Sequence, residues 1–139
     1  MKHDAVREGI RLGLVAATSI WIWIAVVDVL TGDPFRTFTV LGGIAQFTVL
    51  HYALNLAYGV LSVAAVHSAA REPSLTGVLW FVFVVVEFAF VMVTILLSHV
   101  GLGALAWLRI FGGSLVGAAI AILVLSRSHG WRRVVTNQE

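Results

Sequence analysis

The sequence predicts an all-α integral membrane protein: a bundle of four transmembrane helices with both termini in the cytoplasm. Hydrophobic residues make up 60% of the 139 positions and charged residues only 12%, with a mean hydropathy of +0.98. That composition is typical of membrane proteins rather than of soluble domains. The apolar residues also gather into runs, and a spanning helix needs about 20 mainly apolar residues. The four runs cover about 12–30, 39–66, 77–97 and 104–125, which predicts a single transmembrane domain over residues 1–139.

The first predicted span, 12–30, follows a charged lead of 11 residues. It is longer than the hydrophobic region of a signal peptide, and no small-residue cleavage site follows it, so we expect it to be retained. After it, Asp33 and Pro34 match a helix N-cap with proline at the first helical position. The second helix is therefore predicted to start at Pro34, enter the membrane near Thr39 and continue to about Val66.

The third predicted span, 77–97, begins after a loop in which Pro73 breaks the helix and Ser74 or Thr76 serves as the N-cap. A short glycine-containing turn, 98–103, then leads into the fourth span, 104–125. The chain has no cysteine. Disulfides, thiolate metal sites and thiol redox chemistry are therefore excluded.

The basic residues indicate the orientation in the membrane. They concentrate in the N-terminal lead, in the second loop and in the C-terminal tail, whereas the first loop has only Arg36 and the third has none. By the positive-inside rule, both termini and the second loop lie in the cytoplasm, and we expect the protein in the inner or plasma membrane of the cell. The residues on that side are Lys2, Arg7, Arg11, Arg71, Arg127, Arg132 and Arg133.

Glu87 lies near the middle of the most hydrophobic run, where a carboxylate is costly. It must face protein or water, stay protonated or have a partner. At about 1.5 Å per residue, Glu87 and His51 lie roughly 15 and 16 Å from the outer face, and Asn55 is one helical turn from His51. We expect a ladder of polar side chains from the outer face to just past the midplane, which is also the candidate site for a ligand or proton: Asp28, Arg109, Glu87, His51 and Asn55.

The ladder contains two predicted pairs. Asp28 and Arg109 are expected to form an ion pair at the outer rim, as structural support. Glu87 and His51 lie at matched depth, and intramembrane ionisable residues are functional by default. We therefore predict that His51, and not Arg109, is the nearer partner of Glu87.

A metal or haem at His51 and Glu87 is not expected. Both are legitimate ligands, but two ligands are too few for a tight metal site within one subunit. Bis-histidine haem needs histidines at matching depths on two helices, and no other histidine of one chain matches His51. The sequence therefore predicts no cofactor.

Small residues recur at four-residue spacing on two helices, a pattern that lets membrane helices approach closely. One of these two stripes is expected to face a neighbouring subunit, which predicts a homo-oligomer, most simply a dimer. The first stripe is Gly9, Gly13 and Ala17, and the second is Gly113, Gly117 and Ala121.

Three classes of function remain open. The first is a module that uses Glu87 and His51 to bind or relay a proton, a cation or a small ligand, as in transport. The second is a membrane-embedded enzyme or binding protein for a lipid-soluble substrate, with Trp21, Trp23 and Phe83 as its apolar wall. The third is an accessory subunit of a larger membrane complex. Membrane lipid is the expected surrounding, and nucleic acid is not an expected partner.

Overall fold

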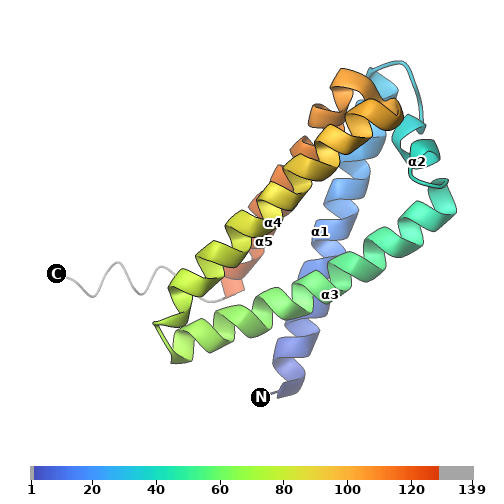
Figure 1. Ribbon diagram of the computed structural model, residues 1–139. Coiled ribbons are helices and arrows are strands. Elements are labelled where there is room, and N and C mark those ends of the chain that lie inside the picture. The colour runs from blue at the N-terminus through green and yellow to red at the C-terminus, as the bar shows by residue number, and fades with distance from the viewer. Residues whose placement is uncertain (1, 129–139) are drawn as a thin grey trace.

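The computed structural model describes residues 2–128, and these residues are helical with no strand. Three short turns of π- and 3-10-helix stand between the fourth and fifth α-helices: η1 (Ser98–Leu102), η2 (Gly103–Leu105) and η3 (Trp107–Phe111). The α-helices are α1 (Lys2–Leu30), α2 (Arg36–Val40), α3 (Ile44–Arg71), α4 (Leu75–Leu97) and α5 (Gly112–Ser128) (Figure 1).

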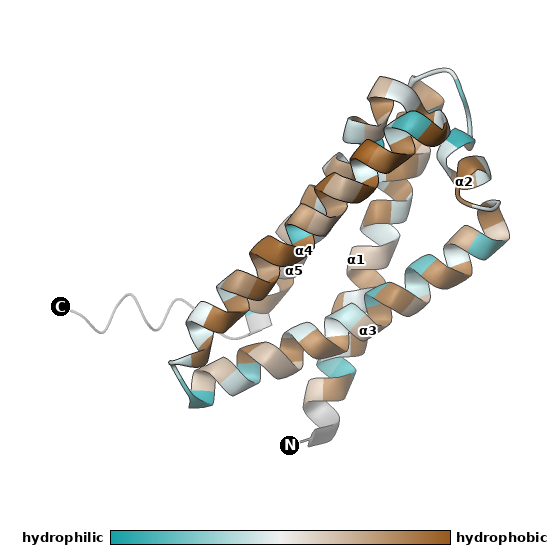
Figure 2. Ribbon diagram, viewed as in Figure 1, coloured by the Kyte–Doolittle hydropathy of each residue, from teal (hydrophilic) through white to brown (hydrophobic). Residues whose placement is uncertain are grey.

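Four helical segments of the described chain are long and apolar enough to cross a membrane, which confirms the predicted helical-bundle class. Figure 2 shows hydrophobic residues along all four, most densely on α4. In a bilayer only a helix satisfies every backbone hydrogen bond within one segment, so composition alone dictates this class. The segments are Ala5–Leu30, Ile44–Arg71, Leu75–Leu105 and Trp107–Arg127.

The second predicted helix is broken, and its predicted start at Pro34 is wrong. The short α2 ends at Val40, and α3 begins only at Ile44. Between them Gly42 and Gly43 have φ angles of 100° and 99°, a region that glycine adopts at little cost and that ends a right-handed helix. Asp33 is not the N-cap either, because that position is held by Phe35 with no side-chain cap.

The first helix is longer than predicted, and the third is displaced toward the C-terminus. The first, α1, begins at Lys2 rather than near residue 12, because no breaker separates the charged lead from the apolar run. The third, α3, continues past Val66 to Arg71, shortly before Pro73. Both helices thus extend beyond their apolar stretches at the same end of the molecule (Figure 1).

The most extensive packing joins α1 to α3. A β-carbon on Gly9 would overlap the backbone of Val60, and one on Gly13 would overlap the backbone of Asn55. Gly59 on α3 faces Gly9 and Gly13 in the same way. The two backbones therefore lie in direct contact, which is the close approach that small residues permit in membrane helices.

The second stripe of small residues also packs inside the chain, on the other side of α1. A β-carbon on Gly117 would lie 2.6 Å from Ile20 Cδ1, and Gly113 faces Ile20 and Trp23. Ala121 belongs to the buried core with Leu12, and Ala17 is wholly buried. Both stripes are thus used within one protomer, so the argument that one is left over for a neighbouring subunit is wrong.

The helices α3 and α4 diverge from their connection at residues 72–74, while α1 passes behind them (Figure 1). The contacts of α4 are concentrated on η1 and η3, and it meets α3 at few places. Most of its large apolar side chains, such as Phe81 and Phe88, are exposed. The bundle is consequently built around α1, which packs against both α3 and α5, with α4 set apart from α3.

Candidate functional site

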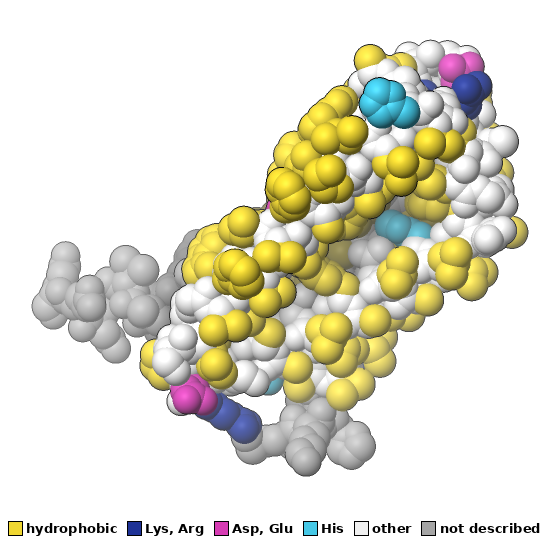
Figure 3. All heavy atoms as spheres, in the orientation of Figure 1, with side chains coloured by type: hydrophobic (Ala, Val, Ile, Leu, Met, Phe, Trp, Pro, Cys, Tyr) yellow, Lys and Arg dark blue, Asp and Glu magenta, His cyan; other side chains and the backbone are white. Residues whose placement is uncertain are grey.

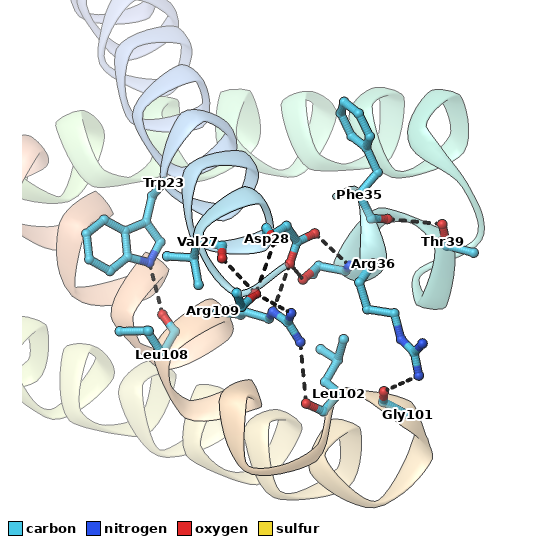
Figure 4. Close-up of polar contacts among 12 residues, drawn as sticks. Trp23, Val27, Asp28, Phe35, Arg36, Thr39, Gly101, Leu102, Leu108 and Arg109 are labelled. Atoms are coloured by element: carbon cyan, nitrogen blue, oxygen red, sulfur yellow. Dashed lines mark hydrogen bonds and ion pairs between the residues drawn. The ribbon is translucent and has the colours of Figure 1, made fainter. Parts of the chain in front are cut away.

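The predicted polar ladder separates into two places in the fold. Its first part is the pair Asp28 and Arg109, with Arg109 Nε 2.8 Å from Asp28 Oδ1. The side chains are 0% and 2% exposed, so this predicted ion pair is buried rather than set at a solvated rim. Figure 4 shows the two side chains pointing toward each other from the end of α1 and from η3.

Hydrogen bonds use the remaining polar atoms of that pair. The carboxylate of Asp28 accepts the Thr37 backbone N–H at 2.8 Å and the Thr37 hydroxyl at 2.7 Å. Arg109 Nη2 donates to Thr31 Oγ1 at 2.9 Å, and Nη1 lies 3.5 Å from the Leu102 carbonyl. A buried charge is tolerable when it is paired and hydrogen-bonded in this way. The cluster joins α1, α2, η1 and η3 and closes one end of the bundle.

Two further hydrogen bonds reinforce that closed end (Figure 4). Trp23 Nε1 donates to the Leu108 carbonyl at 2.9 Å, and Arg36 Nη2 donates to the Gly101 carbonyl at 3.0 Å. The Gly101 carbonyl belongs to η1 and the Leu108 carbonyl to η3, irregular turns where the α-helical hydrogen-bond ladder is interrupted. These contacts brace the irregular turns at this end of the bundle.

Glu87 and Asn55, from the second part of the ladder, line an open-sided cavity of about 250 Å³ among α1, α3, α4 and α5. Figure 3 shows the surface hollowed between α3 and α4. The walls are mainly apolar, and four polar side chains, from α3, α4 and α5, interrupt them. The lining consists of Ala16, Ile20, Leu54, Asn55, Tyr58, Val86, Glu87, Phe90, Ser114, Gly117 and Ala118.

Glu87 lines this cavity and has Ser114 as its hydrogen-bonding neighbour. Ser114 Oγ lies 3.4 Å from Glu87 Oε2 and 2.9 Å from the Phe111 carbonyl oxygen. A hydroxyl has one hydrogen to donate, and Ser114 donates it to the nearer acceptor, the Phe111 carbonyl. Ser114 therefore holds Glu87 only loosely, and the carboxyl group remains available to the cavity.

His51 does not line the cavity, and the predicted pairing of His51 with Glu87 is wrong. Its Nε2 lies 3.0 Å from the Ala17 carbonyl, which only accepts, so Nε2 carries the hydrogen. Its ring stacks on Phe47 with centroids 5.1 Å apart. His51 is thus used in the contact between α1 and α3.

Asn55 connects His51 to the cavity. Its Nδ2 donates to the His51 carbonyl at 2.8 Å and lies 3.4 Å from His51 Nδ1, the ring nitrogen left to accept. These contacts use both amide hydrogens, because each Asn has two. What Asn55 can offer to the cavity is its carbonyl oxygen, Oδ1, an acceptor.

The predicted apolar wall is made by other residues. Trp21 donates to Thr48 Oγ1 at 3.0 Å across α1 and α3, and Phe83 packs edge-on against Trp80 on α4. Trp23 contributes to the closed end, so none of the three lines the cavity. An indole N–H needs a hydrogen-bond acceptor when it is buried, and both Trp21 and Trp23 lie where such an acceptor is available. The large apolar side chains of the wall are instead Ile20, Leu54, Val86 and Phe90.

Sequence reasoning missed the polar residues that complete the two places: Ser114, Thr31 and Thr37. Ser114 directly follows Gly112 and Gly113. A small polar residue on a smooth helix face is a frequent interhelical partner, so this signal was available. No comparable signal connects Thr37 with Asp28, because that contact depends on how α2 folds back. Among the described residues, no group of three His, Asp or Glu side chains could hold a metal ion.

Comparisons of the chain with protein-family models, with curated proteins and with solved structures found no match. The candidate site therefore rests on the geometry of the cavity alone.

Proposed function

We propose that this chain is an integral membrane protein that binds a small, largely apolar molecule in the cavity between α3 and α4. The observation that carries the proposal is a mainly apolar cavity with Glu87 in its wall. Ligand sites are typically apolar hollows with a few placed polar groups. A cavity of about 150 Å³ holds benzene, so one of about 250 Å³ suits a two-ring molecule.

The position of the cavity supports a ligand that arrives from the lipid. Asn55 and Glu87 lie near the middle of α3 and α4, two of the candidate spans. The surface is hollowed where these helices diverge, on the side of the bundle that lipid would cover (Figure 3). A lipid-soluble molecule would reach Glu87 by moving sideways, without crossing a polar headgroup region first.

A proton relay has less support. A relay needs adjacent ionisable groups, and His51 is bonded to Ala17 and Asn55 rather than to Glu87. Arg109 is paired with Asp28 in the closed end. The lining also contains no second acid or base beside Glu87, which leaves general acid–base catalysis without a pair of groups.

The proposal includes the inner or plasma membrane as the location, with both termini in the cytoplasm. The beginning of α1, the link between α3 and α4, and the end of α5 lie at one end of the bundle (Figure 1). Arg7, Arg11, Arg71 and Arg127 belong to these segments. Arg36 and Arg109, on the opposite segments, are bonded to Gly101 and to Asp28. This asymmetry is what the positive-inside rule relates to the cytoplasm.

The test is uptake of the neutral two-ring hydrocarbon 1-ethylnaphthalene by the protein in lipid nanodiscs, measured by equilibrium dialysis with empty nanodiscs subtracted. We expect saturable uptake of about one molecule per chain. Ala118→Leu should abolish it by filling the cavity, and Ala119→Leu, at the next and exposed position, should not. Uptake that is not saturable, or that is equal in the two variants, would contradict the proposal.

A further inference from the structure

We infer that the ligand of this cavity is an organic ammonium ion, with its nitrogen at Glu87 and its hydrocarbon body against the apolar wall. The inference rests on the proposed function and names the class of molecule that the same cavity takes. Three observations lead to it: the direction of the hydrogen bonds, the charge of the lining and the nature of the walls.

The polar groups of the cavity mainly accept hydrogen bonds. Glu87 as a carboxylate only accepts. Asn55 has both amide hydrogens engaged on α3, which leaves Oδ1, and Ser114 has its hydrogen on the Phe111 carbonyl at 2.9 Å. Only the hydroxyl of Tyr58 has a hydrogen to donate. A ligand that brings N–H donors matches this set, and one that brings only acceptors does not.

The lining carries one acid and no base. Of its 11 residues, Glu87 is the one carboxylic acid, and none is Lys, Arg or His. The arginine of the predicted polar ladder, Arg109, has its charge balanced by Asp28. An ionised carboxylate in a mostly apolar cavity is costly without a counter-charge. A cationic ligand supplies the positive charge that the cavity lining lacks.

The apolar walls favour an organic cation over a metal ion. Hard cations such as Ca²⁺ take six to eight oxygen ligands. The cavity offers the carboxylate of Glu87, the carbonyl of Asn55 and two hydroxyls among predominantly apolar side chains. Ile20, Leu54, Val86 and Phe90 provide contacts for hydrocarbon instead, and a primary ammonium group needs only about three acceptors.

The experiment compares 1-naphthylmethylamine, which is cationic at neutral pH, with the neutral 1-ethylnaphthalene of nearly equal size. Both are titrated against the full chain in nanodiscs, with empty nanodiscs subtracted. We expect the amine to bind the wild type at least tenfold more tightly. Glu87→Gln should remove that advantage and leave uptake of the neutral hydrocarbon unchanged. The matched control is Glu72→Gln, which deletes the same charge from the exposed link between α3 and α4 and should preserve the advantage.

A second measurement uses only the wild type, in case Glu87→Gln does not fold. Dicyclohexylcarbodiimide modifies carboxyl groups in apolar surroundings, and peptide mass spectrometry reports its addition at Glu87. The amine should halve this modification at a concentration at least tenfold below that needed for the hydrocarbon. Equal protection, or an amine advantage that survives Glu87→Gln, would overturn the inference while saturable hydrocarbon uptake kept the proposed function. Absence of saturable binding for either probe would overturn both.

Discussion

Arg109 Nε on η3 and Asp28 Oδ1 at the end of α1 lie 2.8 Å apart in a place where neither side chain is more than 2% exposed. The same carboxylate holds the backbone and hydroxyl of Thr37. Two residues 81 positions apart thus join the first span, the broken second helix and the approach to the last span. The irregular segments between the spans are ordered by this contact rather than by helix propensity.

The first prediction concerns this pair. Arg109→Met should destabilise the fold by about 3–5 kcal/mol, because it leaves Asp28 charged, buried and without its counter-ion. The double variant Asp28→Asn/Arg109→Met should lose less than the sum of the two single variants, since no uncompensated charge remains. The measurement is equilibrium unfolding in mixed micelles of increasing dodecyl sulfate content, followed by circular dichroism. Strictly additive losses would show that the pair does not act as a unit.

The second prediction concerns the contact between α1 and α3. Gly13→Ala should destabilise the protein by about 1–3 kcal/mol, because the added β-carbon meets the backbone of Asn55, which cannot move aside as a side chain would. Gly77→Ala on α4 is the matched control. No atom lies within 4 Å of a β-carbon there, and alanine favours a helix over glycine by up to about 1 kcal/mol. The two variants should shift the unfolding midpoint in opposite directions, and a neutral Gly13→Ala would refute the close approach.

The third prediction separates Glu87 from Asp28, the two acidic residues of the predicted ladder. Glu87→Leu should change the free energy of unfolding by less than about 1 kcal/mol, because interhelical hydrogen bonds in membranes are worth about 0.6 kcal/mol and Ser114 keeps its bond to Phe111. Asp28→Leu should lower the free energy of unfolding by at least about 3 kcal/mol, because it leaves Arg109 buried and unpaired. Thermal and dodecyl sulfate unfolding of the two variants should be compared. Equal destabilisation would make Glu87 a structural residue.

The fourth prediction concerns topology. Fusions of paired reporters, one active in the cytoplasm and one active outside it, after residues 33, 74 and 139 should report outside, inside and inside. The reason is that basic residues concentrate at the end of the bundle that holds the start of α1, the link at 72–74 and the end of α5. A C-terminal fusion that reports outside would reverse the orientation, and one that differs from the fusion at 74 would contradict four spans.

The sequence by itself determined the class of fold and singled out the unusual charges. Each apolar run must satisfy its own backbone hydrogen bonds in lipid, so the helical state follows from local composition. Glu87, Asp28 and Arg109 were recognisable for the same reason, since ionisable groups within spans are rare. The break at Gly42 and Gly43 was missed, although consecutive glycines favour the positive φ angles found there.

Only the tertiary structure decided which of these residues meet. Position along a span gives the expected depth of a residue, and Glu87 and His51 were expected at the same depth, but depth is one coordinate of three. Rotation about each helix axis turns His51 toward Ala17 on α1, and Glu87 points from α4 to Ser114 on α5. The glycine stripes show the same limit of sequence reasoning. A stripe of small residues permits close packing of another helix, but it does not specify which helix. The neighbour is chosen by the packing of all four spans together, which no local pattern in the chain encodes.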